Sequence, residues 1–135
     1  MDNSIKSILL RAKNVVIIGA SSNSDKDSFK VMKFLQEKDF KVIPVNSKTL
    51  NTKILGEKVY KNINEININI DIVNIFRPSS EIFDLVNKII NKKVKTVWLQ
   101  LEIFCFDSEK KLNQLGINFV QNKCTKIEYE KLIDS

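Results

Sequence analysis

The chain has 135 residues, 43% of them hydrophobic and 28% charged. This length and composition are typical of one globular domain, so we expect a single domain over 1–135, without extensive disorder or a membrane-spanning segment. The formal net charge of +6 favours an anionic partner such as a phosphate. The basic residues are scattered and only Arg11 and Arg77 are arginines, so no nucleic-acid surface is expected. Because its first residues are too polar for a secretory signal, the protein is expected to be cytoplasmic.

Helical and strand-like patterns alternate along the first half of the chain. A helix is expected over 4–12, a strand over 15–18, a helix over 28–38 and a second strand over 41–45. After a polar loop, the pattern predicts a turn entering a short edge strand over 56–60 and one helical turn over 62–66.

The second half continues the alternation with three strands and three helices. The strands are expected over 71–76, 95–100 and 117–121. Helices are expected over 79–91 with Ser79 or Ser80 as N-cap, over 107–115 with Gly116 at the C-terminal end, and over 126–133. This order predicts an α/β fold, a three-layer Rossmann-like, doubly wound and mostly parallel sheet.

The turn after the first strand has the features of a phosphate site. Residues 13–23 read KNVVIIGASSN, an apolar β-branched run that stops at Gly19 before a helix. Glycine allows close approach of a ligand, and a helix N-terminus offers N–H groups to an anion. Only one glycine of the G-x-G-x-x-G fingerprint is present, so the motif alone fits a structural turn equally well. The candidate phosphate-binding residues are Gly19, Ala20, Ser21, Ser22, Asn23 and Ser28.

The other strand ends add further candidates, because open α/β sheets bind ligands beyond the carboxyl ends of their strands. These candidates are Val45, Asn46, Phe76, Arg77, Trp98 and Gln100. Tryptophan within a strand is more often a core residue than a stacking platform, and Gln100 could bind the ligand or cap the strand. Lys30 could reach a phosphate, although a solvated lysine is the commoner case.

Residues that usually carry catalysis or bind metals are scarce. The chain has no histidine, which excludes Ser–His–Asp and Cys–His pairs and removes the commonest metal ligand. Its two cysteines, Cys105 and Cys124, would normally stay reduced in a cytoplasmic protein. Cys124 could exchange with a bound thiol, but a buried inert cysteine is more common. We expect no metal site and assign no catalytic residue.

Several stretches, taken in order, resemble one family. They are GASSN from Gly19, FKVMKFL from Phe29, VIPVN from Val42, ILGEKVY from Ile54, VWLQL from Val97 and the tail NKCTKIEYEKL from Asn122. Together they make the chain similar to the small stand-alone CoA-binding proteins, Rossmann-type relatives of the CoA-binding domain of succinyl-CoA synthetase. The match covers nearly the whole chain, and such collinearity is more specific than any single motif.

The resemblance implies coenzyme A as ligand, with its pyrophosphate at the first strand-to-helix turn. Ala20, Ser21 and Ser22 would then meet the phosphates through N–H and hydroxyl groups, and Val45 and Asn46 would border the adenine or ribose. Phe76 and Arg77 would line the opposing wall, with Arg77 as the charge partner of a phosphate.

Four positions depart from the pattern of this family. Ser24 and Asp27 stand where proline is common, and Asn122 stands where an acid is common. Glu102 occupies a position that is often small or neutral, and its carboxylate would repel an anionic ligand if it faces the crevice. These departures bear on the affinity for CoA and leave the fold prediction unchanged.

The leading functional hypothesis is a non-enzymatic or regulatory module that binds CoA or a short acyl-CoA. One alternative is a subunit of an acyl-CoA ligase or transferase, and the other is an NAD(H) or adenine-nucleotide sensor. NAD binding would favour an acid after the second strand, whereas Asn46, Ser47 and Lys48 lie there. Lys48 suits the extra 3′-phosphate of CoA. The sequence leaves open whether the protein forms a homo-oligomer or binds a partner protein.

Overall fold

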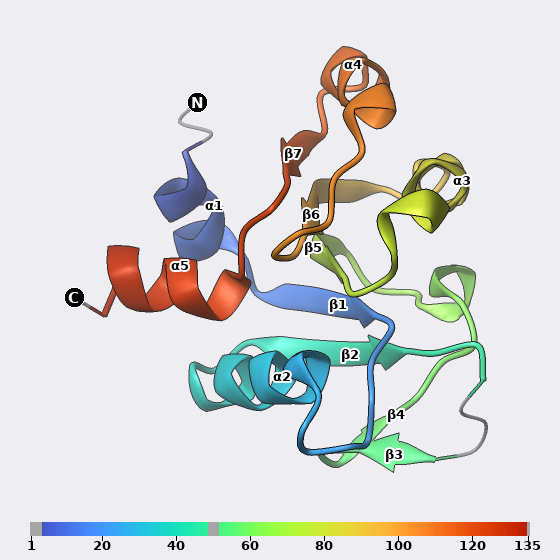
Figure 1. Ribbon diagram of the computed structural model, residues 1–135. Helices are drawn as coiled ribbons and strands as arrows, with labels where there is room; N and C mark the ends of the chain where they lie inside the picture. The colour runs from blue at the N-terminus through green and yellow to red at the C-terminus, as the bar shows by residue number, and fades with distance from the viewer. Residues whose placement is uncertain (1–3, 49–51, 135) are drawn as a thin grey trace.

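The computed structural model describes residues 4–48 and 52–134. Figure 1 shows strands and helices alternating along the chain, and none of the helices in the described ranges has the length and apolar character to cross a bilayer. The elements are α1 (Ile5–Arg11), β1 (Asn14–Ile18), α2 (Asp27–Glu37), β2 (Lys41–Val45), β3 (Lys53–Ile54), β4 (Glu57–Lys58), the 3₁₀ turn η1 (Ile63–Glu65), β5 (Ile70–Ile75), α3 (Ser79–Ile89), β6 (Val94–Leu99), α4 (Phe106–Gln114), β7 (Asn118–Val120) and α5 (Thr125–Leu132).

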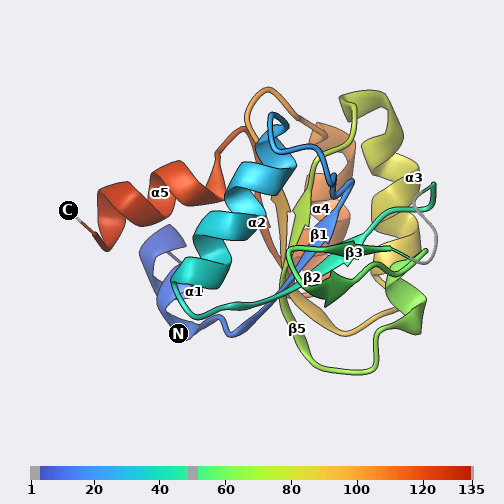
Figure 2. The ribbon, with the colours of Figure 1, turned by 90° about the horizontal axis from the view of Figure 1, so that it is seen from below.

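Alternating burial on the strands explains the layers of the fold. On β1, Val15 and Ile17 pack with residues of α1, α2 and α5, whereas Val16 and Ile18 pack with residues of α3 and α4. Figure 2 shows the same division, with α1, α2 and α5 on one side of the sheet and α3 and α4 on the other. Both faces of the sheet are therefore covered, as the apolar strand sequences predict for a parallel sheet. The three-layer α/β prediction is confirmed.

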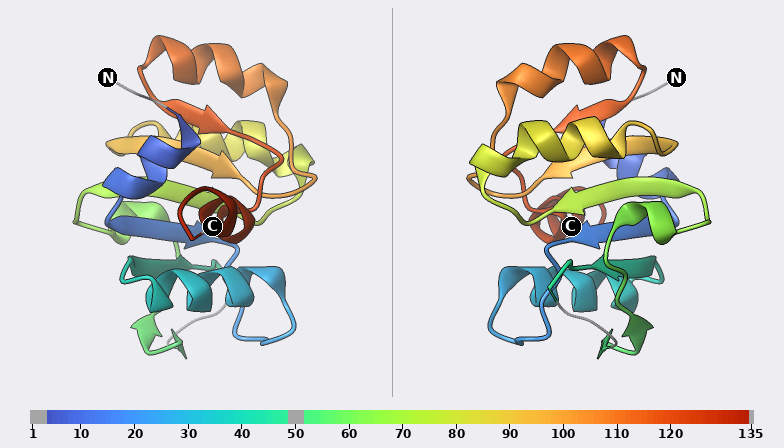
Figure 3. Two further views of the ribbon diagram at one scale, coloured as in Figure 1. Left: turned by 90° about the vertical axis from the view of Figure 1, so that its left-hand side faces the viewer. Right: turned by 90° about the vertical axis from the view of Figure 1, so that its right-hand side faces the viewer.

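The main sheet has five parallel strands in the order β2-β1-β5-β6-β7. Figure 3 shows them stacked in this order, with the β3–β4 hairpin beyond β2. The chain leaves β1 toward β2 on one side and later returns to β5 on the other. The strand order thus reverses between β1 and β5, which is the position where open α/β sheets bind ligands.

The segment predicted as one edge strand over 56–60 forms a small hairpin instead. β3 and β4 pair antiparallel, apart from the main sheet. The connecting residues Leu55 and Gly56 both have positive φ, 48° and 83°, as tight hairpin turns require. Tyr60 adds a single parallel bridge to Val45, so within the described ranges it is the one residue outside the five strands that extends the main sheet.

The predicted hydroxyl N-cap of α3 is wrong. Pro78 is the N-cap residue, without a side-chain cap bond. The Ser79 hydroxyl instead accepts a hydrogen bond of 3.0 Å from the Phe104 N–H. This bond ties the start of α3 to the loop after β6, a tertiary contact that a local capping pattern does not reveal.

Candidate functional site

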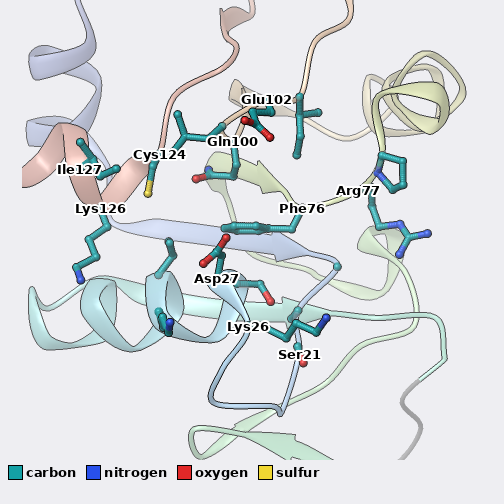
Figure 4. Close-up of a pocket in the computed structure, with 18 of the residues that line it drawn as sticks. Ser21, Lys26, Asp27, Phe76, Arg77, Gln100, Glu102, Cys124, Lys126 and Ile127 are labelled. Atoms are coloured by element: carbon teal, nitrogen blue, oxygen red, sulfur yellow. The ribbon is translucent and has the colours of Figure 1, made fainter.

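Two adjoining cavities open at the carboxyl edge of the sheet, where the strand order reverses. The larger has a volume of about 750 Å³ and extends from the turn after β1 to α5 (Figure 4). The smaller has a volume of about 310 Å³ and lies between the loop after β2, η1 and α3. Gly19, Asn46 and Arg77 line both cavities and form their shared boundary. Volumes of this order suit a cofactor-sized ligand.

Gly19 brings the ends of β1 and β5 together. Its φ is +84°, and a Cβ atom here would overlap the carbonyl oxygen of Phe76. The N–H groups of Gly19 and Ala20 donate to the Val45 carbonyl at 3.0 and 3.2 Å. Both N–H groups are thus engaged with the backbone, and the contact of Ala20 with a phosphate stays a prediction. The glycine is needed for packing at this turn whether or not a ligand is bound.

Asn46 joins the turns after β1 and β2. Its Nδ2 donates to the Ala20 carbonyl at 2.7 Å, and its Oδ1 accepts from the Lys48 N–H at 2.8 Å. Asn46 lines both cavities, and both ends of its amide are bonded to the backbone. Val45 is buried and lines the smaller cavity only.

The turn before α2 is organised by short side chains. The Ser21 hydroxyl accepts from the Asn23 N–H at 3.0 Å, and Asn23 Oδ1 accepts from the Asp25 N–H at 2.9 Å. Ser21 and the buried Ser28 line the larger cavity, whereas Asn23 and the exposed Ser22 line neither cavity.

The N-terminus of α2 opens onto the larger cavity. Its N-cap residue, Lys26, makes no side-chain cap bond, and Asp27 and Ser28 of the first turn line the cavity. A first helical turn without a side-chain cap leaves N–H groups that can donate hydrogen bonds to an anion. The carboxylate of Asp27 lies in the same turn and opposes such an anion. In this part of the cavity the N-terminus of α2 therefore attracts an anion, while the Asp27 carboxylate repels it.

Arg77 lies at the boundary of the two cavities, and its guanidinium already has a partner. Its Nε and Nη2 donate to the two carboxylate oxygens of Glu81 at 3.1 and 2.7 Å. This hydrogen bonding lowers the pKa of Glu81 below its ordinary value, against a smaller opposing effect of desolvation. Both side chains are more than a third exposed, so an incoming phosphate can compete for the guanidinium.

Gln100 lines the larger cavity and also organises the start of α5. Its Nε2 donates to Asn74 Oδ1 at 3.0 Å and to Thr125 Oγ1 at 2.8 Å, while its Oε1 accepts from the Thr125 N–H at 3.2 Å. Trp98, another candidate, belongs to the core. Its side chain is fully buried, its Nε1 donates to the Lys123 carbonyl at 2.7 Å, and it lines neither cavity.

Several cavity residues lie outside the sequence-derived candidate set. Lys48, Lys61 and Lys88 line the smaller cavity, and Cys124, Lys126, Ile127 and Glu130 line the larger one. Among these, the sequence points to Lys48, by its place after the second strand, and to Cys124, as a thiol that could exchange with a bound thiol. The other two lysines come from separate segments of a lysine-rich chain, where no spacing distinguishes them from solvated residues.

Comparisons with known proteins show which family the chain belongs to. The model of the family described as CoA binding domain matches residues 13–130. The uncharacterized protein YneT of Bacillus subtilis is 30% identical over 125 residues, 93% of this chain and 91% of that protein.

Two solved structures share nearly the whole fold. A hypothetical protein from Pyrococcus horikoshii is 33% identical, with a TM-score of 0.90 over 98% of this chain and 92% of the other. The protein called cell-free ID.343 from Thermus thermophilus is 27% identical, with a TM-score of 0.91 over 96% of each chain. The chain therefore belongs to the CoA-binding domain family.

Proposed function

We propose that the protein is a binding module for coenzyme A or a short acyl-CoA, which it holds across both cavities. The adenosine end with its 3′-phosphate lies in the smaller cavity, and the pantetheine arm lies in the larger one. The pyrophosphate crosses the boundary formed by Gly19 and Arg77, the residues that line both. The protein acts by binding, and no side chain is assigned a reaction step.

The observation that carries the proposal is the charge of the smaller cavity. Lys48, Lys61, Lys88 and Arg77 line it, and no Asp or Glu is among its described lining residues. Cationic groups gathered from four separate segments make a site for a multiply charged anion. CoA carries a 3′-phosphate on its ribose that NAD lacks, so this cavity favours CoA over a dinucleotide.

The larger cavity suits the uncharged arm of the ligand. Phe76, Ile127 and Val31 supply apolar walls, and Gln100 supplies a polar contact at the far side. Figure 4 shows Phe76 near the middle of this cavity, between Arg77 on one side and Cys124 on the other. A ligand anchored at Arg77 would pass over Phe76 and place its thiol end near Gln100 and Cys124.

Calorimetric titration with CoA, dephospho-CoA and NAD tests the proposal. We expect CoA to bind most tightly and dephospho-CoA, which lacks the 3′-phosphate, to bind about tenfold more weakly, a loss typical of one charge-assisted contact. The Lys48→Ala and Lys88→Ala variants should weaken CoA binding and leave dephospho-CoA binding nearly unchanged. Lys131→Ala is the matched control, because this exposed lysine lies on α5 and lines neither cavity.

The outcomes separate the hypotheses. Tighter binding of NAD than of CoA would replace the proposal by a dinucleotide sensor. Equal affinity for CoA and dephospho-CoA would contradict the proposed binding of the 3′-phosphate in the lysine-lined cavity. No binding of any ligand would contradict the module as proposed and direct attention to a partner chain that completes the site.

A further inference from the structure

Glu102 has an unusual place in the larger cavity. It follows β6 in the loop that leads to α4, it lines the cavity, and its backbone has a φ of 66°. Few non-glycine residues adopt this left-handed conformation, which costs free energy and is found more often at functional positions than elsewhere. Its N–H donates to Asn122 Oδ1 at 2.8 Å, so the loop after β7 holds this turn in place.

The carboxylate of Glu102 has no cationic partner among the described residues. The ion pairs there join Lys38 to Asp134, Arg77 to Glu81 and Lys95 to Asp71. The ammonium of Lys126, the cavity lysine on α5, lies over the Phe34 ring at 5.7 Å from its centroid. In Figure 4 the Lys126 side chain points away from Glu102, which lies beside Gln100.

The neighbours of Glu102 in the chain are apolar, while Gln100 and Asn122 are polar groups close to it. Leu101 and Ile103 flank it and line the same cavity, as does Ile127 on α5. Leu101 and Ile127 are 53% and 48% exposed, so they offer apolar surface that a ligand could cover. Glu102 thus places a negative charge beside the apolar side chains of Leu101 and Ile103. Two further carboxylates, Asp27 of α2 and Glu130 of α5, line the same cavity on other elements.

This inference rests on the proposed function, which fixes the direction of the ligand. The smaller cavity lies at the ends of β1 and β2, whereas Gln100 and Glu102 follow β6, two strands beyond β1 in the sheet. A CoA molecule with its phosphates at Arg77 directs its thiol, or the acyl group bound to it, toward Glu102.

We propose that Glu102 determines acyl specificity, so that the site accepts neutral short-chain acyl-CoA thioesters and disfavours those whose acyl group ends in a carboxylate. The apolar residues Leu101, Ile103 and Ile127 take up the neutral chain. A terminal carboxylate would lie near the unpaired Glu102 carboxylate and would be repelled. Because Glu102 is exposed, water screens this repulsion, and we expect an effect of about fivefold on affinity.

Butyryl-CoA and succinyl-CoA form the matched pair of probes, since both have four-carbon acyl groups and only the second ends in a carboxylate. Titration of the full chain should show butyryl-CoA binding about fivefold more tightly than succinyl-CoA. In Glu102→Gln this preference should disappear, and in Glu102→Lys it should reverse. Glu128→Gln, on α5 but outside both cavities, should keep the wild-type preference.

CoA itself is titrated in the same experiment, and thermal unfolding checks that each variant is folded. If CoA binds but the ratio of the two thioester affinities is the same in wild type and Glu102→Gln, the specificity role is wrong and the proposed function stands. If wild type binds succinyl-CoA as tightly as butyryl-CoA, the role is also wrong. If CoA does not bind, the proposed function fails and the inference fails with it.

Discussion

The N–H of Glu102 donates a hydrogen bond of 2.8 Å to Oδ1 of Asn122, and both residues have left-handed backbone conformations, with φ of 66° and 57°. The Asn122 N–H in turn donates to the Ile103 carbonyl at 3.2 Å. Two sharp turns, after β6 and after β7, therefore lock each other and fix the wall of the larger cavity that carries Glu102 and Cys124.

Replacing Glu102 by glycine should stabilise the protein. Glycine adopts positive φ without steric penalty, although it gains more freedom in the unfolded chain, and the net effect should be about 1 kcal/mol in the free energy of unfolding. Urea denaturation measures this change. Asn122→Ala should have the opposite sign, with a loss of about 1–2 kcal/mol, because the Glu102 N–H loses its acceptor. Equal changes in the free energy of unfolding for the two substitutions would contradict the mutual stabilisation of the two turns.

Gly19→Ala should strongly destabilise the fold. The added Cβ would overlap the Phe76 carbonyl oxygen, and alanine at a φ of +84° is strained, so the loss should be at least about 3 kcal/mol. Thermal unfolding of the ligand-free protein measures it. An unchanged melting temperature would show that the turn can move, and the glycine would then have to be explained by its ligand.

Asp27→Asn should separate stability from binding. A carboxylate in the first turn of α2 interacts favourably with the helix dipole, so its removal should lower stability by about 0.5 kcal/mol. The same change removes a negative charge beside the proposed pyrophosphate and should tighten CoA binding about threefold. Asp25→Asn is the control, since Asp25 precedes the helix and lines neither cavity. Weaker CoA binding by Asp27→Asn would place the pyrophosphate elsewhere.

Glu81→Gln should free Arg77 for the ligand. The bidentate bond to Arg77 lowers the pKa of Glu81, so the carboxylate stays charged and competes with a phosphate at neutral pH. We expect CoA binding about threefold tighter in the variant at low ionic strength, with a smaller difference in high salt because the charges are screened. A difference that is independent of salt would argue against competition for the guanidinium.

Lowering the pH should destabilise the protein through Asp71, which lies near the amino-terminal end of β5, away from the cavities. Desolvation raises the pKa of its carboxyl, but hydrogen bonds from the N–H groups of Asn14 and Lys13, both at 2.9 Å, and the Lys95 ammonium at 3.2 Å outweigh it and lower the pKa. A lowered folded-state pKa stabilises the protein above the unfolded-state value, and this stability is lost as pH falls through the folded-state value.

The Asp71→Asn variant tests this linkage. It should cost about 1–2 kcal/mol of stability at pH 7 and much less near pH 3, while CoA binding stays unchanged because Asp71 lies at the far edge of the sheet from both cavities. Thermal unfolding at several pH values measures the effect. A difference from wild type that is the same at all pH values would contradict the role of the charge.

The sequence predicts the sheet well because its signals are local and strong. The apolar β-branched run 15–18 and the residues Ile72, Val73 and Ile75 of β5 favour burial, and Gly116 marks the end of α4 with a φ of 72°. The hairpin over 53–58 was harder to predict, because its strands are two residues each and carry no periodicity.

The site was only partly predictable, since its chemistry depends on partners distant in sequence. Asn46 is predicted to border the adenine or ribose, and the sequence gives no sign that its amide also bonds to Ala20 and Lys48. Trp98 was a candidate for stacking, but its indole N–H reaches the Lys123 carbonyl within the core. Lys61 and Lys88 join one cavity only through the fold, so no motif could indicate them.

A crystal structure of the protein with CoA tests the central claim most directly. The account predicts the 3′-phosphate within hydrogen-bonding distance of Lys48 or Lys88, the pyrophosphate beside Gly19 and Arg77, and the thiol end near Gln100 and Glu102. Electron density for the adenosine end in the larger cavity, or for the whole molecule outside both cavities, would contradict it.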